Sequence, residues 1–387
     1  MMIERIDSFK NDMKAWRHDL HRHPELAFEE RRTADFVAER LESFGIATDR
    51  GLAGTGVVGT LKAGTSKRVL GLRADMDALP ILEANKFSHR SVHDGRMHAC
   101  GHDGHTAMLL GAAKYLAETK PFDGTVHFIF QPAEESAGGA RIMIEQGLFE
   151  RFPVDAVYGL HNMPGLPVGQ FAMRVGPIMA SFDSFDIVVK GTGTHAALPQ
   201  LGSDQIVAAA AIVGALQTVV SRVLDPTEPA LVSITRIKGG DSYNVIPDEV
   251  LLSGCARCFS DDIQDKMKKA IVRIAKEVAA ANGATAEVRF IEHYPPTVST
   301  KEGVAASSRA AADVVGAHNV NIEAKALLTA EDFGYMLKER PGSYVLMGNG
   351  PGDGGCLLHN PRYDFNDEAL TIGAKYWARL VERELGT

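Results

Sequence analysis

A stretch of ten residues, Met97–Thr106, reads MHACGHDGHT and contains one cysteine, one aspartate and three histidines. An apolar core has no use for so many imidazoles, because burying them without partners costs free energy. Thiolate, imidazole and carboxylate groups are the ligands that zinc and related metals take in proteins. Cys100 and His102 lie two positions apart, so they share a side of an extended loop but not of a helix. The stretch therefore predicts one part of a metal site.

Residues of the same kinds follow four other short apolar runs. They are Asp75 and Asp77 after 68–74, Glu134 and Glu135 after 124–131, His161 after 155–160, and His359 after 343–349. In an open α/β sheet, sites form beyond the carboxyl ends of the strands, where the loops converge. Five loops are therefore expected to bring ligand-type side chains to one edge of a sheet, which predicts a metal site at that edge.

The number of candidate ligands favours two ions. One metal needs three or four protein ligands, and a catalytic metal keeps a position open for water. Two ions a few ångströms apart can share a water, lower its pKa and polarise a carbonyl group. On an extended segment Glu134 and Glu135 point to different sides, so one can bind metal while the other acts as general base. The predicted chemistry is metal-assisted hydrolysis by Zn, Mn, Ni or Co.

The pattern around these residues predicts the sheet that positions them. Strands are expected at 68–75, 124–131, 155–162 and 343–349, and helices at 105–119, 139–149, 302–315 and from 367. Strands that alternate with helices of this length indicate an α/β fold with a mostly parallel sheet.

Residues 182–293 follow a different order. A strand (181–191), a long helix (203–223), two adjacent strands, a helix (262–283) and a last strand are expected there. This β-α-β-β-α-β order is the split, ferredoxin-like plan. We therefore expect a catalytic domain in two parts, 1–181 and 294–387, with a smaller domain inserted at 182–293.

Composition excludes several classes of partner. The chain has 387 residues, of which 41 are basic and 49 acidic, for a net charge of −8. Nucleic acids and anionic membranes call for a basic surface, so neither is expected as a partner. The longest apolar run, 206–216, has only about half the length of a bilayer span. The amino-terminal residues lack the apolar core of a secretory signal, and four cysteines are too few for a disulfide scaffold, so we expect a cytoplasmic protein.

Seven segments together resemble one known family, and they occur in its order along essentially the whole chain. They are RADMDALP, MHACGHDGHTAMLLGAA, QPAEE, GLHNMPGLPVG, GTHAALP, YNVIPDEV and LHNPRYDFND. The chain resembles the hippurate hydrolase, aminoacylase and indole-acetyl-amino-acid hydrolase branch of the glutamate-carboxypeptidase-like di-metal metallopeptidases. The resemblance implies the di-zinc exopeptidase type of fold and an amidohydrolase that cleaves N-acetyl, N-benzoyl or similar N-acyl amino acids.

The resemblance also implies roles for individual residues. The metal ligands would be Cys100, His102, Glu135, His161 and His359, and the general base would be Glu134. The inserted domain would act as lid and dimerisation domain of a homodimer. In that domain His195 would polarise the scissile carbonyl, often in the neighbouring subunit's site, and Asn244 would contact the substrate. The wider superfamily has a histidine ligand where this chain has Asp75, which leaves the roles of Asp75 and Asp77 open.

Three other functions compete with this one. A metallo-dipeptidase or carboxypeptidase would use the same site on small peptides. A cysteine-nucleophile hydrolase would use Cys100 with His102 or His105 and would survive metal removal. A binding protein with a structural metal would need a closed, usually cysteine-rich site.

Several other residues have structural interpretations. The histidines at 98 and 105 are expected beside the ligands or at the surface, and those at 18, 21 and 23 in structural contacts. Asp103 is expected to cap the helix at 105. Cys255 and Cys258 lie three apart on a predicted strand and so face opposite sides, which argues against a metal or redox pair.

Overall fold

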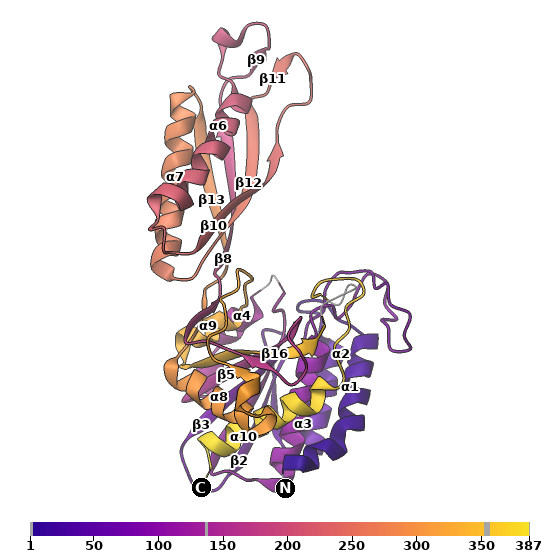
Figure 1. The fold of residues 1–387 in the computed structure, drawn as a ribbon. Helices are drawn as coiled ribbons and strands as arrows, with labels where there is room; N and C mark the ends of the chain where they lie inside the picture. The colour runs from indigo at the N-terminus through magenta and orange to yellow at the C-terminus, as the bar shows by residue number, and fades with distance from the viewer. Residues whose placement is uncertain (1–2, 136–137, 352–356, 387) are drawn as a thin grey trace. The chain divides into compact units, whose positions relative to one another are not determined.

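The computed structural model describes residues 3–135, 138–351 and 357–386, and its ribbon is drawn in Figure 1. Contacts between residues divide the chain into two compact units. Unit 1 contains Met1–Ile178, Val298–Lys325 and Asp332–Thr387, and unit 2 contains Met179–Thr297 and Ala326–Glu331. The segment Ala326–Glu331 returns to unit 2 from beyond the predicted insertion, which no sequence pattern had indicated.

Unit 1 is built on a large sheet. Its strands are β1 (Ala47–Leu52), β2 (Gly56–Ala63), β3 (Val69–Asp75), β4 (Gly124–Gln131), β5 (Ala156–Pro164), β6 (Phe171–Ala172), β15 (Val320–Asn321) and β16 (Gly342–Gly350). The spatial order is β1-β2-β4-β3-β5-β16-β6-β15. The four central strands, β4, β3, β5 and β16, run parallel to one another. Strand β2 runs antiparallel to both of its neighbours, β1 and β4. The prediction of a mostly parallel sheet in an α/β fold is confirmed.

Helices cover this sheet. They are η1 (Ile3–Phe9), α1 (Lys10–Arg22), α2 (Arg31–Ser43), α3 (His102–Thr119), α4 (Gly139–Glu145), α5 (Leu148–Arg151), α8 (Lys301–Val315), η4 (Ala317–Asn319), α9 (Phe333–Glu339) and α10 (Ala369–Glu384). Two short strands, β7 (Gly176–Met179) and β14 (Thr297–Ser299), form a separate pair.

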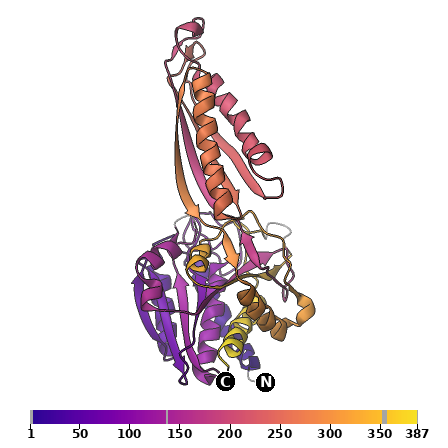
Figure 2. The same cartoon turned by 90° about the vertical axis from the view of Figure 1, so that its left-hand side faces the viewer.

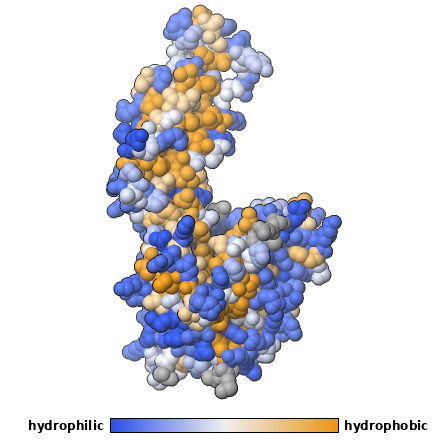
Figure 3. Space-filling view, viewed as in Figure 1, coloured by the Kyte–Doolittle hydropathy of each residue, from blue (hydrophilic) through white to orange (hydrophobic). Residues whose placement is uncertain are grey.

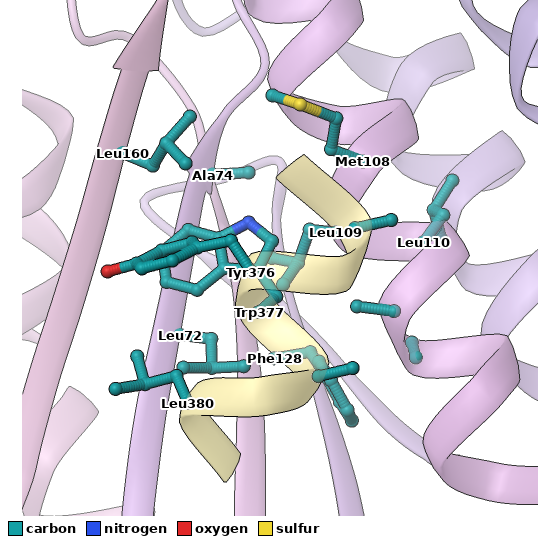
Figure 4. Close-up of a cluster of buried hydrophobic side chains, with 14 of the residues drawn as sticks. Leu72, Ala74, Met108, Leu109, Leu110, Phe128, Leu160, Tyr376, Trp377 and Leu380 are labelled. Carbon is teal, nitrogen blue, oxygen red and sulfur yellow. The ribbon is translucent and has the colours of Figure 1, made fainter. Parts of the chain in front are cut away.

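The main core lies between α3, α10 and one face of the sheet (Figure 4). Trp377 and Leu380 on α10 are buried against α3 and against Leu72 on β3 and Phe128 on β4. Alternate residues of a strand point to opposite faces, so this packing leaves Arg73, the neighbour of Leu72, on the other face. Because α3 is anchored along its whole length, its first turn is held firmly at the end of β3.

Unit 2 has a second, separate core. Its elements are β8 (Phe182–Lys190), β9 (Thr194–His195), η2 (Pro199–Leu201), α6 (Gln205–Thr218), η3 (Val219–Val223), β10 (Ala230–Lys238), β11 (Val245–Ile246), β12 (Glu249–Cys258), α7 (Asp261–Ala281) and β13 (Thr285–Tyr294). The sheet order is β10-β12-β8-β13, all antiparallel. Figure 2 shows α6 and α7 together on one face of it. The predicted β-α-β-β-α-β order is confirmed.

Two details of unit 2 bear on sequence expectations. Cys258 is buried and Cys255 is half-buried on β12, whose residues alternate in burial, so the two thiols face opposite sides as predicted. Among the described residues, Gln205–Val223 is long and apolar enough to cross a membrane by length and composition alone, and 28% of its apolar 18-residue window is buried in the protein. The unbroken apolar run in the sequence, 206–216, is shorter than this helix because Gln217 ends it.

Candidate metal centre

The candidate site lies where the four parallel strands of unit 1 end. Asp75 is the last residue of β3, and His161 lies on β5. The loops after β4 and β16 carry Glu135 and His359, and Cys100 lies two residues before the start of α3. The structure therefore brings the residues of all five predicted loops to one edge of the sheet.

The predicted ligands form overlapping groups. Ligand atoms lie within 4.8 Å of one another in three such groups: Cys100, His102 and His161; Cys100, Glu135 and His359; His102, Glu134 and Glu135. Cys100 and His102 each belong to two of them, so the groups make one continuous cluster. That cluster offers more ligand atoms than a single catalytic ion would use.

The two buried histidines present their Nε2 atoms to the cluster. His102 Nδ1 lies 3.2 Å from Oδ1 of Asp77, and its buried Nε2 has no hydrogen-bond partner. His161 Nδ1 lies 2.6 Å from the carbonyl oxygen of Asn162, and its Nε2 lies 3.3 Å from Cys100 Sγ. Donation from Nδ1 leaves a lone pair on Nε2, as in metal-ligating histidines. Because a buried polar atom without a partner is costly, the orphaned Nε2 of His102 fits a bound cation.

The exposed side of the cluster is formed by Glu135 and His359. His359 Nε2 lies 3.1 Å from Glu135 Oε1, yet this buried oxygen makes no hydrogen bond of acceptable geometry. His359 has a positive φ of 61°, in the left-handed region that only a few per cent of residues other than glycine adopt. Backbone strain of this kind persists where the surrounding structure enforces it, and it is concentrated at functional sites.

The electrostatics of Cys100 oppose a role as a nucleophile. Burial, followed by the charges of Glu135 and Glu134, raises the pKa of the Cys100 thiol well above its ordinary value. Burial lowers the pKa of its partner His161 well below the usual range. A catalytic thiol needs a lowered pKa, whereas a thiol that binds a cation is deprotonated by the cation itself. The surroundings of Cys100 therefore fit a metal ligand.

Asp77 connects three parts of the site. Besides its contact with His102, its Oδ1 accepts the backbone N–H of Glu134 at 3.0 Å, and its Oδ2 accepts that of Glu135 at 2.9 Å. Burial would lower the pKa of His102, but the charge of Asp75 and the hydrogen bond with Asp77 raise it to about 10. These carboxylates thus favour a positive charge at this ring, which a cation bound to Nε2 would supply in place of a proton. Asp77, whose role the sequence left open, therefore contacts a predicted ligand histidine and holds the backbone of both glutamates.

Asp75 is held by neighbours of its own. Its Oδ1 lies 2.6 Å from His105 Nδ1, and its Oδ2 accepts a hydrogen bond from Arg73 at 2.7 Å. His105 Nε2 accepts the backbone N–H of Asn162 at 3.0 Å. Asp75, His102 and His105 could also hold an ion by distance. Because both nitrogens of His105 are already used, we interpret Asp75 and His105 as supports for the ligands, in agreement with the expectation for His105.

Of the two positions expected for His98, beside the ligands or at the surface, the structure excludes the surface: His98 is buried, and neither ring nitrogen has a hydrogen-bond partner. The expectation for Asp103 was wrong. Asp103 does not cap the helix, because α3 begins at His102 after Gly101, whose φ is 93°. The chain thus turns sharply at Gly101 instead of staying extended, and glycine suits this position because a Cβ there would overlap the side chains of Asn162 and Tyr363.

The amino-terminal histidines lie apart from the ligand groups. His21 is buried between Asp103, 2.9 Å away, and Glu83, 3.2 Å away. His18 Nε2 lies 3.0 Å from Asp367, and His23 ends α1. None of the three belongs to a candidate metal group among the described residues, which agrees with the structural interpretation.

In unit 2, His195 and Asn244 lie side by side. His195 on β9 pairs with Val245 on β11, and Ala196 donates its N–H to the carbonyl of Asn244 at 3.0 Å. His195 Nδ1 accepts the N–H of Ala197 at 3.0 Å, so a neutral ring carries its proton on Nε2. Asn244 Oδ1 accepts the hydroxyl of Ser242, which leaves the amide N–H groups available. Both side chains are exposed, and both present hydrogen-bond donors.

Comparisons with known proteins bear on this geometry. Residues 71–383 match the profile of peptidase family M20/M25/M40. The chain is 39% identical to a hippurate hydrolase of Campylobacter jejuni over 99% of both chains, and 41% identical to an N-acetylcysteine deacetylase of Bacillus subtilis over 94% of both. It also resembles the crystal structure of a dinuclear metal binding peptidase of Bacillus subtilis, with a TM-score of 0.86 and 37% identity over 98% of this chain and 99% of that one.

Proposed function

This chain belongs to peptidase family M20/M25/M40, and we propose that it is a metal-dependent amidohydrolase that releases a carboxylic acid and a free amino acid from N-acyl amino acids. The observation that carries this proposal is the cluster of metal-binding side chains at the sheet edge, with Glu134 within reach of it. The names of the two relatives favour this substrate class, because hippurate and N-acetylcysteine are both N-acyl amino acids.

The ligands would be Cys100, His102, Glu135, His161 and His359, and they would hold two divalent ions. Two ions bound there would acidify a water and polarise the scissile carbonyl. One thiolate with several imidazoles suits Zn, Ni or Co, and the carboxylate also tolerates Mn.

Glu134 would move the proton. Its carboxylate is buried, and its backbone is held by Asp77, so the side chain is confined beside the ligands. In the proposed reaction Glu134 accepts a proton from the attacking water and gives it to the nitrogen of the departing amino acid. The C–N bond breaks and a C–O bond forms, so water and amide are converted to acid and amine.

We propose that unit 2 supplies donors for the carbonyl oxygen. This oxygen gains negative charge as water attacks, and donors aimed at it stabilise the transition state. His195 carries a proton on Nε2, and Asn244 has free amide N–H groups, so both suit this task. His195 would polarise the carbonyl, and Asn244 would contact the substrate.

We also propose that the protein is a homodimer formed through α6. Figure 3 shows apolar surface over this helix, where Ile206 is 44% and Val207 is 55% exposed. No charged residue lies between Gln205 and Ser221. An apolar helix face of this kind is normally covered by a partner. Sedimentation should show a dimer, and a monomeric wild-type protein would contradict the proposal.

A charged side chain on this face provides the matched test. A Cβ at Gly214 would meet nothing within 4 Å, so Gly214→Arg should fold and should shift the protein towards monomer. Lys269→Glu, at an exposed position on α7, should leave the dimer unchanged.

We propose the cytoplasm as the compartment. Cys100, Cys255 and Cys258 are free thiols, which a reducing compartment preserves. An oxidised Cys100 could not bind a cation.

A release assay tests the main proposal. The protein would be incubated with N-acetyl, N-benzoyl and indole-acetyl amino acids and with unblocked dipeptides, with and without added Zn²⁺, Mn²⁺, Ni²⁺ or Co²⁺. We expect release from the N-acyl amino acids and much slower release from dipeptides. Faster cleavage of dipeptides would assign the site to a peptidase instead.

A further inference from the structure

The residue before the proposed base has an unusual backbone conformation. Ala133 is fully buried and has a positive φ of 56°. L-residues other than glycine and asparagine rarely take this region, because the Cβ crowds the backbone. The turn at Ala133 sets the direction in which Glu134 and Glu135 leave β4, so whatever holds this turn also sets the position of both glutamates.

Two buried carboxylates hold three consecutive backbone N–H groups at this turn. Asp77 accepts those of Glu134 and Glu135, as described above. The N–H of Ala133 is accepted at 2.9 Å by Oε1 of Glu30, a residue 103 positions earlier in the chain. Glu30 therefore completes the set of contacts that Asp77 begins.

Glu30 has no other evident task. It occupies the N-cap position of α2, but its side chain makes no capping hydrogen bond. The helix N–H groups of Arg32 and Thr33 are capped by Glu25 instead, at 3.1 and 2.8 Å. The second oxygen of Glu30 accepts the hydroxyl of Thr55 at 2.6 Å.

Keeping Glu30 buried is costly. It is fully buried, and none of the described basic side chains forms an ion pair with it. Burial raises the pKa of its carboxyl to about 7, and the neighbouring charge of Asp77 acts in the same direction. Burying a carboxyl group without a cation beside it lowers the free energy of unfolding. We therefore ask which function its two hydrogen bonds serve.

We propose that Glu30 is a positioning residue that holds Ala133 in its left-handed turn and thereby aims Glu134 at the attacking water. This inference rests on the proposed role of Glu134 as general base. Without Glu30, the N–H of Ala133 would be buried without an acceptor, and the turn would relax towards an ordinary conformation. A displacement of about 1 Å in a catalytic group can lower turnover about 100-fold.

Four variants test this proposal. Glu30→Ala removes the acceptor for Ala133, and we expect kcat to fall about 10- to 100-fold with KM changed less than about threefold. Glu30→Gln keeps an oxygen for Ala133 and can donate to Thr55, so it should stay within about fivefold of wild type. Thr55→Val is the matched control, because it removes the other contact of Glu30 and should keep kcat within about threefold. Ala133→Gly in the Glu30→Ala protein should restore part of kcat, because glycine takes a positive φ without strain.

Hydrogen exchange supplies a readout that needs neither substrate nor metal. In the metal-free protein, Glu30→Ala should raise the exchange rate of the backbone N–H groups of residues 133–135 at least about tenfold. The exchange rates in β3 and β5 should stay unchanged. A general loss of stability would raise exchange throughout unit 1. If Glu30→Ala does not fold, Glu30→Asp serves in its place, because a side chain shorter by one methylene group withdraws the carboxylate from the N–H of Ala133, and Thr55→Val controls for the loss of the second contact.

The possible results separate two failures. Wild-type kcat per metal-loaded site in the Glu30→Ala or Glu30→Asp protein, or unchanged exchange at 133–135, would overturn the role of Glu30 and leave the proposed function standing. If wild type releases product from no substrate, the proposed function fails, and the exchange measurement still decides whether Glu30 holds the turn.

Discussion

The sheet edge of unit 1 and the β9–β11 strand pair of unit 2, called the tip of unit 2 below, differ in how they hold their proposed functional residues. At the sheet edge His102 and His161 are buried, and each is oriented by a second group. At the tip of unit 2, His195 and Asn244 are exposed, and among the described residues their contacts come from neighbours within a few residues along β9, β11 and their loops. The side chains at the sheet edge are preorganised within unit 1. The side chains at the tip of unit 2 present hydrogen-bond donors to solvent.

This difference indicates what each region can do alone. Preorganised side chains can bind cations without the free-energy cost of rearrangement. Exposed donors gain strength only when water is excluded around them, which requires another surface to cover them. We therefore expect substitutions at the sheet edge to act through ion binding or proton transfer, and substitutions at the tip to leave ion binding intact.

The largest effect is expected at Glu134. Glu134→Gln should retain both ions and lose about 10²- to 10⁴-fold in kcat, because the amide cannot accept the proton of water. Glu135→Gln is the matched control and should lose metal as well as activity. Activity and metal content measured on the same samples distinguish the two, and near-wild-type turnover of Glu134→Gln would exclude it as the base.

The next effect is expected at His195. His195→Ala should keep the fold and the metal content and lower kcat about 10²- to 10³-fold, the usual cost of one oxyanion donor. If the histidine serves the partner's site, mixing His195→Ala with Glu134→Gln should restore activity, since a mixed dimer has one intact site. Absence of recovery despite proven subunit exchange would mean that His195 acts within its own chain or not at all.

A smaller effect is expected at the cysteines, and it compares the two units directly. Cys100 should react with an alkylating agent at least about tenfold faster after chelation, because a bound ion blocks its thiolate. Cys255, half-buried in unit 2, should react at the same rate with and without metal. Mass spectrometry of each peptide gives both rates. Equal rates for Cys100 in the two states would argue against its role as a ligand.

The smallest effect concerns the buried contacts of His21 with Asp103 and Glu83. Burial lowers the pKa of His21, but its hydrogen bonds with Asp103 and Glu83 raise it to about 9, above the ordinary 6.5. The protonated form is favoured in the folded state, so this contribution to stability is complete below pH 6.5 and is lost as the pH rises through about 9. His21→Gln should flatten the fall in unfolding free energy over that range, and His195→Ala should not. An unchanged slope in His21→Gln would contradict the assignment.

The sequence predicted the sheet and the cluster because both depend on short-range patterns. The alternation of strands and helices predicted parallel strands, and the carboxyl ends of parallel strands meet at one edge. His161 and His359, about two hundred residues apart, could be assigned to one site on this ground alone. The inserted order of strands and helices followed from local periodicity in the same way.

The supports of the site could not be predicted, because they depend on contacts between distant residues. Nothing in the segment around Glu30 indicates that its side chain reaches Ala133 instead of capping α2. The start of α3 was placed three residues late, because the glycine that turns the chain before His102 reads equally well as part of a loop. The sequence showed Asp77 two residues beyond a strand end. Its contacts with His102, Glu134 and Glu135 depend on tertiary structure and could not be predicted.

The central claim is that hydrolysis depends on ions held by the cluster at the sheet edge. Metal-free protein would be titrated with Zn²⁺ or Mn²⁺ while the release of amino acid from an N-acyl amino acid and the bound metal are both measured. We expect no release without metal, a rise that reaches its plateau at two ions per chain, and loss of release on chelation. Release that persists in protein shown to be free of metal would contradict it.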